Sequence, residues 1–170
     1  ELQEHDACGV GFVASTTGVA SHDIVQKTIG ALASVQHRGG VGADGKTGDG
    51  AGIKTQLPKE FFKAEYEAAG QSLDGRDIGV GMFFLPRNNL EAQDKIRTVI
   101  TQTLSEMGYT DSAWRKTPVN ADVLGKLADD NRPHIEQLII PAKEGVDAAA
   151  FEKDLYVARR LIENRVREQG

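Results

Sequence analysis

Apolar residues follow two different periods in the first third of the chain. The segment CGVGFVA at 8–14 is short, apolar and spaced by glycines, which predicts a buried strand with close backbone packing. From Ser21 onward, apolar residues recur at the spacing of one helix face, so the pattern predicts a helix that starts at this N-cap residue and ends at the glycines after Arg38. After a glycine-rich loop, alternation in AGIKTQL at 51–57 predicts a second strand.

The rest of the chain alternates between strand and helix patterns. Three apolar runs predict strands, one of them at a sheet edge, and three stretches with helical spacing predict helices. The strands are expected at 78–86, 113–119 (the edge strand) and 134–142, and the helices from Asn89, from Asn120 through Leu127, and around the inward-facing Phe151, Leu155 and Ile162. This alternation is typical of a layered α/β or α+β fold, in which residues 78–170 form a βα-rich lobe.

Length and charge narrow the class of protein. A chain of 170 residues with 39% apolar residues fits one compact domain with a hydrophobic core. Its formal net charge is −5 and its Lys and Arg residues are scattered, so the sequence offers no basic patch for nucleic acid or for an acidic membrane surface. No apolar run approaches the roughly 20 residues that cross a bilayer. A neutral or small polar ligand is therefore expected.

Cysteine usage and the first residues indicate a cytoplasmic protein. The single cysteine, Cys8, cannot form an intramolecular disulfide. The segment ELQEHDA at 1–7 has neither the basic start nor the apolar stretch of a secretory signal. No group of His, Cys, Asp and Glu residues has the spacing of a metal site, and one cysteine cannot hold an iron–sulfur cluster.

The glycine-rich loop contains a nucleotide-binding pattern in an unsuitable context. Gly40, Gly45, Lys46 and Thr47 spell G-x-x-x-x-G-K-T, the pattern of a loop that wraps phosphates. Such a loop needs a strand before it and a helix N-terminus after it, whereas here a predicted helix precedes it and a predicted strand follows. Two aspartates also flank the lysine, and their charge opposes a bound phosphate. The pattern is therefore interpreted as a glycine-rich connector with a solvated lysine.

Cys8 is the candidate for chemistry. A lone cysteine in an apolar strand is usually a small buried hydrophobe. Cys8, however, lies at the start of its predicted strand and would become the first residue if residues 1–7 were removed. The α-amine of an N-terminal cysteine, with a pKa near 8, can then serve as the base for its own thiol. Such a nucleophile needs no histidine partner.

Motifs in the same order over nearly the whole chain resemble one family. The segments CGVGF, ALASVQHRG and GADGKTGDGAGI, and later VGMFFLP, TPVNADVLG, PHIEQLII and FEKDLYVARRLIE, are similar to the class II glutamine amidotransferase domain of glutamate synthases. CGVGF and QHRG are shared with the amidotransferases that form purines or amino sugars, whereas ADGKTGDGAG is similar to glutamate synthases in particular. The purine- and amino-sugar-forming transferases remain a less favoured alternative.

The resemblance implies a fold and a reaction. The fold is an α+β N-terminal-nucleophile hydrolase, a layered αββα sandwich, present here in part. Cys8 attacks the side-chain amide of L-glutamine and releases ammonia through a glutamyl thioester. In the whole enzyme the ammonia passes to a flavin domain and combines with 2-oxoglutarate to give glutamate. FMN, an iron–sulfur cluster and NAD(P)H or ferredoxin belong to those remaining domains, so the resemblance implies no cofactor in this segment.

The resemblance also assigns supporting roles and a division of the chain. Arg38 is expected near the nucleophile end of the sheet, in packing and hydrogen bonding. The segment from Asp44 to Gly50, with Asp49 and Gly50 as supporting residues, is expected to form a loop near the active site or at a domain interface. Residues 1–7 are expected to be a propeptide that keeps the α-nitrogen of Cys8 in an amide. Residues 8–77 are expected to carry the nucleophile, helix and glycine-rich loop, and residues 78–170 the βα-rich lobe.

Several expectations concern the chain as an isolated piece. The glutamine-binding and oxyanion-hole residues of the family are expected beyond Gly170, since no Asn-Gly pair occurs in the sequence. Losing one oxyanion donor costs about 100- to 1,000-fold in rate, so the piece alone is expected to be inactive. Unpaired sheet edges are expected to cause self-association. The alternative function is a catalytically silent scaffold or interaction domain of the same fold.

Overall fold

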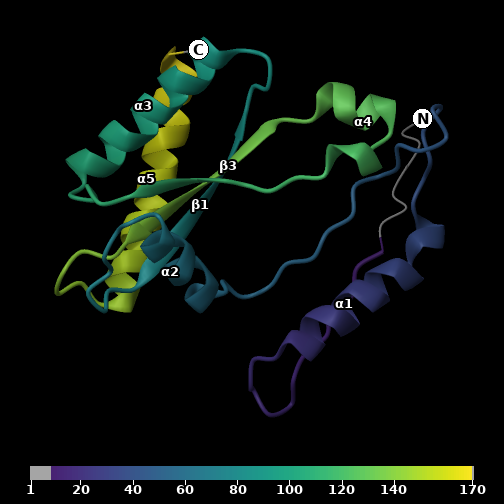
Figure 1. Ribbon diagram of the computed structural model, residues 1–170, viewed down its shortest axis with the longest axis horizontal. Coiled ribbons are helices and arrows are strands. Elements are labelled where there is room, and N and C mark those ends of the chain that lie inside the picture. The colour runs from purple at the N-terminus through teal and green to yellow at the C-terminus, as the bar shows by residue number, and fades with distance from the viewer. Residues whose placement is uncertain (1–8, 170) are drawn as a thin grey trace, which may run out of the picture. The chain divides into compact units, whose positions relative to one another are not determined.

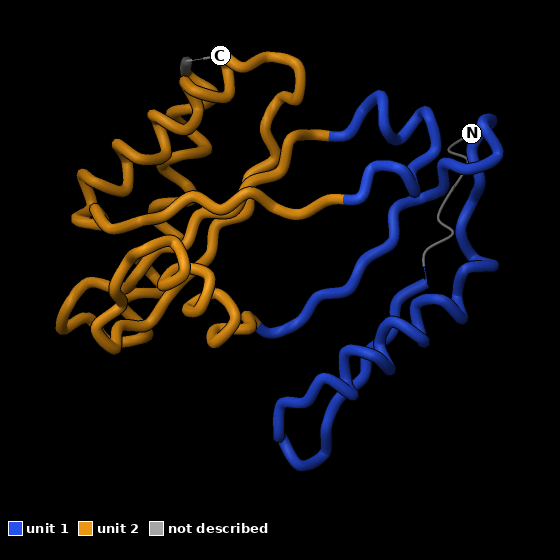
Figure 2. The backbone as a smooth tube through the Cα atoms, viewed as in Figure 1, with its two compact units in different colours: residues 1–56, 120–132 blue, residues 57–119, 133–170 orange. Residues whose placement is uncertain are grey.

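The computed structural model describes residues 9–169, and the chain divides into two compact units (Figure 2). Unit 1 contains residues 1–56 and 120–132, and unit 2 contains residues 57–119 and 133–170. Unit 1 therefore takes a segment from the middle of the sequence. This segment, residues 120–132, connects two strands of the unit 2 sheet, at 113–116 and 134–141.

Unit 2 is an α+β layer structure around a small antiparallel sheet (Figure 1). Strand β3 (His134–Pro141) lies in the centre, between β1 (Ile78–Leu85) and β2 (Ala113–Lys116), and is antiparallel to both. Helices α3 (Leu90–Glu106) and α5 (Ala148–Gln169) pack on one face of the sheet, and α2 (Lys59–Ala68) packs on the other. The mixed α+β class expected from the sequence is confirmed.

Alternation along the central strand separates two apolar clusters. Leu138 and Ile140 face α3 and α5, where they join the main core with residues such as Ile100 and Leu104. Ile139, between them, faces the opposite side and packs with Phe62 and Tyr66 of α2. Burial on both faces of the sheet thus explains why β3 is apolar at consecutive positions.

Helix α3 starts where the sequence indicates. The side-chain oxygen of Asn89 accepts a hydrogen bond of 3.0 Å from the amide of Ala92, which satisfies one of the free amides at the helix start. The predicted strands β1, β2 and β3, and the final helix, are also confirmed, with β2 at a sheet edge as expected.

Unit 1 consists of short elements. Helix α1 (His22–Ser34) follows Ser21, as predicted, and a 3-10 turn at Gln36–Arg38 ends at Gly39. The later segment adds a 3-10 turn at Ala121–Val123 and the short helix α4 (Lys126–Asn131). Among the described residues of this unit only Gly125 is buried, so its elements are held by polar contacts more than by a core.

Four expectations about secondary structure were wrong or incomplete. Residues 9–14 and 51–57 form no strand in the described chain, because no described segment pairs with them, and Cys8 itself lies outside the described residues. The helix expected from Asn120 through Leu127 is instead two elements, since Gly125 is extended between them. Helix α2, which follows Pro58, was not predicted although proline is common at helix starts.

Candidate functional site

The glycine-rich loop at 40–49 folds back on itself as a closed hairpin. Val41 and Gly48 form an antiparallel bridge. The carboxylate of Asp49 accepts a hydrogen bond of 2.8 Å from the amide of Gly40, and the amide of Asp49 donates to the carbonyl of Gly40 at 3.2 Å. Asp49, one of the expected supporting residues, therefore closes the base of the loop.

Asp44 organises the tip of this loop. Its carboxylate accepts hydrogen bonds from the amide of Thr47 at 2.7 Å, from the Thr47 hydroxyl, and from the amide of Lys46 at 3.1 Å. It also accepts one of 3.1 Å from the amide of Leu127, in the later segment of the same unit. The hydrogen bonds from Thr47, followed by that from Leu127, hold the pKa of Asp44 well below its usual range.

The loop is fastened to the first turn of α4. The Thr47 hydroxyl accepts a hydrogen bond of 3.3 Å from the amide of Ala128, and the Lys46 ammonium donates one of 3.1 Å to the carbonyl of Asp122. Asp44 and Thr47 thus act as caps, supplied from elsewhere in the sequence, for the free amides at the start of α4. We call this set of contacts between 44–47 and 122–128 the loop clasp.

The loop clasp explains why the G-x-x-x-x-G-K-T pattern is not a phosphate loop. No helix follows the loop directly, because the chain runs without regular structure from Asp49 to Pro58. The N-terminus of α4, from the later segment of unit 1, does reach the loop. Its amides, however, meet the carboxylate of Asp44, and Lys46, which is exposed as expected, also donates to a backbone carbonyl.

Substitution of Gly125 by alanine is expected to open the loop clasp. A Cβ at position 125 would lie 2.2 Å from the hydroxyl oxygen and 2.4 Å from the backbone nitrogen of Thr47, too close for either to remain in place. Hydrogen exchange at the amides of Leu127 and Ala128 should become faster by at least about tenfold, as loss of roughly 1.4 kcal/mol of local stability implies. Gly52→Ala is the matched control, because a Cβ there meets nothing within 4 Å; equal exchange in the two variants would contradict the role of Gly125.

Acidification is expected to release the clasp only well below the ordinary aspartate pKa of 3.8. Because the pKa of Asp44 is lowered in the folded chain, its stabilising contribution is complete above the ordinary value and is lost as the pH falls through the lowered one. The amide resonances of Thr47 and Leu127, followed by NMR from pH 6 downward, report this change. A midpoint near the ordinary value would show that the clasp does not stabilise the carboxylate, and Asp44→Asn should remove the titration.

The other expected site residues lie in unit 1, apart from the clasp. Gly9, the residue after Cys8, packs against the 3-10 turn: a Cβ at Gly9 would lie 3.5 Å from Cβ of Val35 and 3.7 Å from Cδ of Arg38. The stem of Arg38 therefore lies beside the segment that carries the candidate nucleophile. Gly50 is exposed, with nothing within 4 Å of a Cβ built there. Cys8 is outside the described residues.

Sequence reasoning missed Asp44, Thr47 and Gly125 as organising residues. The signal that could have found them is the spacing of Asp44 and Thr47, since an aspartate that bonds the backbone two and three residues later is typical of a tight loop. Gly125 gave no local signal, because its partner is about 80 residues away in the sequence.

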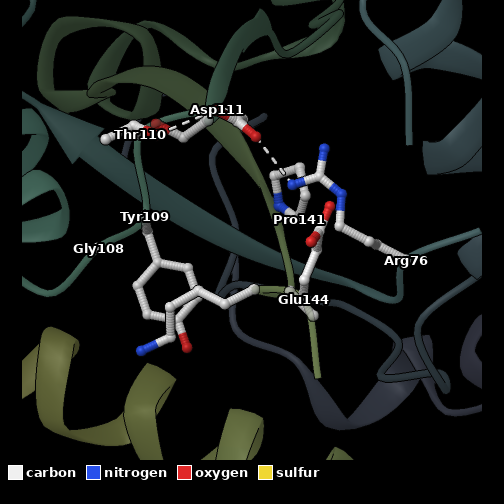
Figure 3. Close-up of a pocket in the computed structure, with 10 residues that line it drawn as sticks. Arg76, Gly108, Tyr109, Thr110, Asp111, Pro141 and Glu144 are labelled. Atoms are coloured by element: carbon white, nitrogen blue, oxygen red, sulfur yellow. Dashed lines mark hydrogen bonds and ion pairs between the residues drawn. The ribbon is translucent and has the colours of Figure 1, made fainter. Parts of the chain in front are cut away.

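A polar hollow in unit 2, drawn in Figure 3, has cationic side chains that are already paired. It measures about 230 Å³ and is lined by residues that include Arg76, Tyr109 and Lys143. Arg76 binds Asp111 at 2.8 Å, while Lys143 and the Tyr109 hydroxyl both bind Asp154, at 2.9 Å and 2.7 Å. Burial, with the bond to Asp154, raises the pKa of Tyr109. The hollow therefore offers no unpaired cation to an anionic ligand.

Within residues 9–169 no group of three or more His, Cys, Asp and Glu side chains could hold a metal ion. None of the helices that the structure describes has the length and apolar character needed to span a membrane.

Comparison with known proteins defines the class. The chain belongs to the class II glutamine amidotransferases, the family that matches residues 8–170. It is 45% identical to the glutamate synthase [NADPH] large chain of Azospirillum brasilense over 164 residues, which cover 96% of this chain and 11% of that protein. It is also 38% identical to the ferredoxin-dependent glutamate synthase 2 of Synechocystis over 168 residues, and 38% identical to the glutamate synthase [NADPH] large chain of Bacillus subtilis over 162 residues.

These matches confirm the family inferred from the motifs. The relatives named above are all glutamate synthases. The chain spans about a tenth of the length of the curated relatives it matches. The family match begins at Cys8 and leaves residues 1–7 outside it.

Proposed function

We propose that this chain is part of the glutaminase domain of a glutamate synthase, with Cys8 as the nucleophile that releases ammonia from L-glutamine. The observation that carries the proposal is the family match, which starts at Cys8 and continues through the chain, together with the similarity to proteins named as glutamate synthases. A single cysteine at the first matched position fits an N-terminal nucleophile.

The reaction needs only one residue for attack and proton transfer. The free α-amine of Cys8 takes the thiol proton, and the sulfur attacks the side-chain carbonyl carbon of glutamine. The tetrahedral intermediate collapses to a thioester as the α-ammonium returns the proton to the leaving nitrogen, which departs as ammonia. Water then attacks the thioester, and its hydrolysis gives glutamate and restores the thiol.

Packing and hydrogen bonds within unit 1 hold the segments near Cys8 and the glycine-rich loop in place. Arg38 packs its stem beside Gly9 and so steadies the chain next to the nucleophile. Asp49 closes the loop at 40–49, and Gly50 leaves the backbone after it open to an approaching group. The loop clasp fixes the shape of this loop. We propose these as positioning residues and leave glutamine binding to residues outside the chain.

The proposal includes a processing step. Residues 1–7 act as a propeptide whose removal frees the α-amine of Cys8, so a chain that retains them does not turn over glutamine. Residues 8–77 carry the nucleophile and residues 78–170 the βα-rich lobe of a partial αββα N-terminal-nucleophile sandwich, which self-associates when isolated.

Cofactor chemistry belongs elsewhere in the proposed enzyme, which we place in the cytoplasm. The one cysteine of the chain cannot supply the several thiolates of an iron–sulfur cluster, so these residues do not fit that group. FMN and the reductant, NAD(P)H or ferredoxin, are likewise proposed to bind the remaining domains. Those domains and L-glutamine are the partners of the chain.

Intact mass and covalent labelling test the proposal. In the full-length gene product we expect loss of the residues before Cys8, followed by addition of one glutamine-mimicking diazo-ketone to the new N-terminal residue. Cys8→Ala should not be labelled, and added L-glutamine should slow labelling of the parent protein. A persistent uncleaved mass without labelling would instead assign the chain to a catalytically silent scaffold of the same fold.

A further inference from the structure

Strand β1 lies at an edge of the unit 2 sheet and has one open side. Its inner side pairs with β3 along the whole strand, from Ile78 opposite Pro141 to Leu85 opposite His134. No strand of the described residues pairs with its outer side. An open edge presents free amide and carbonyl groups, which pair with another strand unless the sequence protects them.

The two edges of this sheet differ in protection. β1 reads IGVGMFFL, without charge or proline, and exposes 48% of Met82 and 67% of Phe84. β2, at the other edge, is only four residues long, contains Arg115 and Lys116, and is followed by Pro118. Short length, charge and proline are the features that keep an edge unpaired, so β2 is protected and β1 is not.

An apolar groove runs beside β1. It measures about 640 Å³ and is lined by β1, α3 and α5, with Ile96 of α3 and Leu155, Ile162 and Val166 of α5 among its residues. Helix α5 approaches β1 closely because Gly79 has no side chain: a Cβ there would lie 2.4 Å from a methyl group of Leu155. The groove therefore offers apolar contacts to alternate side chains of an added strand.

The order of the elements indicates the direction of such a strand. β1 and β2 are both antiparallel to β3, so β1, α3 and β2 form a crossover between parallel strands with β3 between them. β3 and α5 are the first two elements of a second crossover of this kind (Figure 1). Its closing strand would run parallel to β3, and thus antiparallel to β1, in the open place beside β1.

We propose that the outer edge of β1 binds a fourth strand, antiparallel to it, supplied by the polypeptide that continues from α5 in the longer proteins of this family. Its backbone pairs with β1, and its alternate apolar side chains fill the groove against α3 and α5. The glutamate synthase relatives have the required length, since the matched residues are about a tenth of their chains. The inference goes beyond the proposed glutaminase function and does not depend on the chemistry of Cys8.

Hydrogen exchange in the full-length gene product tests the pairing. The amides of β1 that point away from β3 should exchange at least about 100-fold more slowly than the outward amides of β2, and at rates comparable with those of β3. β2 is the matched control, because it is the other edge of the same sheet. Outward amides of β1 that exchange as fast as those of β2 would overturn the proposal.

Photo-crosslinking identifies the occupant. Phe84, exposed and uncharged on β1, is replaced by p-benzoylphenylalanine, with the same replacement at Leu90 on α3, which is 72% exposed, as control. We expect an intramolecular crosslink from position 84 to a segment that follows α5, and no such crosslink from position 90. A crosslink between two copies, together with hydrogen-exchange protection of β1 that decreases on dilution, would show that the edge pairs in a dimer. That result would overturn the proposal of an intramolecular strand. Loss of glutamine hydrolysis alone would leave this result unchanged.

Discussion

The full-length gene product carrying Cys8→Ala is expected to lose the proposed glutamine hydrolysis, with kcat/KM falling by at least about 10⁴-fold. The proposed site has one attacking atom, the sulfur of Cys8, and the chain contains no second cysteine that could replace it. The variant keeps the α-amine but has no nucleophile for it to activate. Release of ammonia from L-glutamine, measured after the mass of the processed N-terminus has been verified, gives the rate.

Two further variants make this result specific to the nucleophile. Cys8→Ser keeps both the α-amine and a hydroxyl, so we expect a residual rate above that of Cys8→Ala but far below that of the parent. Ser15→Ala removes an exposed hydroxyl whose hydrogen bonds, among residues 9–169, are with Thr17 in its own turn, and it should keep full activity. If Cys8→Ala hydrolysed glutamine at the rate of Ser15→Ala, Cys8 would not be the nucleophile.

Leu104→Ala is expected to destabilise unit 2 by about 3 kcal/mol, within the range for leucine removed from a packed core. Leu104 is 1% exposed and belongs to the cluster between the sheet and helices α3 and α5. The free energy of unfolding can be measured in urea from the fluorescence of Trp114, the single tryptophan, whose ring lies 5.4 Å from that of Phe83 in the same unit.

Leu90→Ala is the control for this measurement. It is the same substitution in the same helix, but Leu90 is 72% exposed, so its loss should change the free energy of unfolding by no more than about 0.5 kcal/mol. Similar destabilisation by both variants would mean that helix propensity, and not burial in the core, determines the stability of α3.

The sequence predicts unit 2 better than unit 1, and the reason is burial. β1, β3, α3 and α5 each bury a continuous apolar surface, so their periodicity is a direct record of the core. Residues 9–14 and 51–57 show strand-like patterns, yet a strand also needs a partner, and the described chain supplies none. Helix α2 was missed because only Phe62 and Tyr66 of its residues are buried, too few to show a period.

In the candidate site, too, features encoded by short segments could be predicted, whereas contacts between distant parts of the sequence could not. Cys8 and the glycine-rich loop could be found from motifs, since the family resemblance lies in short segments. The loop clasp could not, because Asp44 and Leu127 are 83 positions apart and their bond depends on how the chain returns to unit 1. Lys46 shows the consequence: the sequence predicts an exposed lysine, which the structure has, but gives no sign of its hydrogen bond to the carbonyl of Asp122.

The same separation imposes an order of events on a chain emerging from the ribosome. Residues up to Gln56 are synthesised long before Gly125 and Leu127. While β1, α3 and β2 are made, the carboxylate of Asp44 therefore cannot accept its hydrogen bond from the amide of Leu127. The glycine-rich loop at 40–49 therefore acquires its contacts with residues 122–128 late in translation. A nascent chain arrested before Asn120 would present that loop to proteases and to chaperones in an unfastened form.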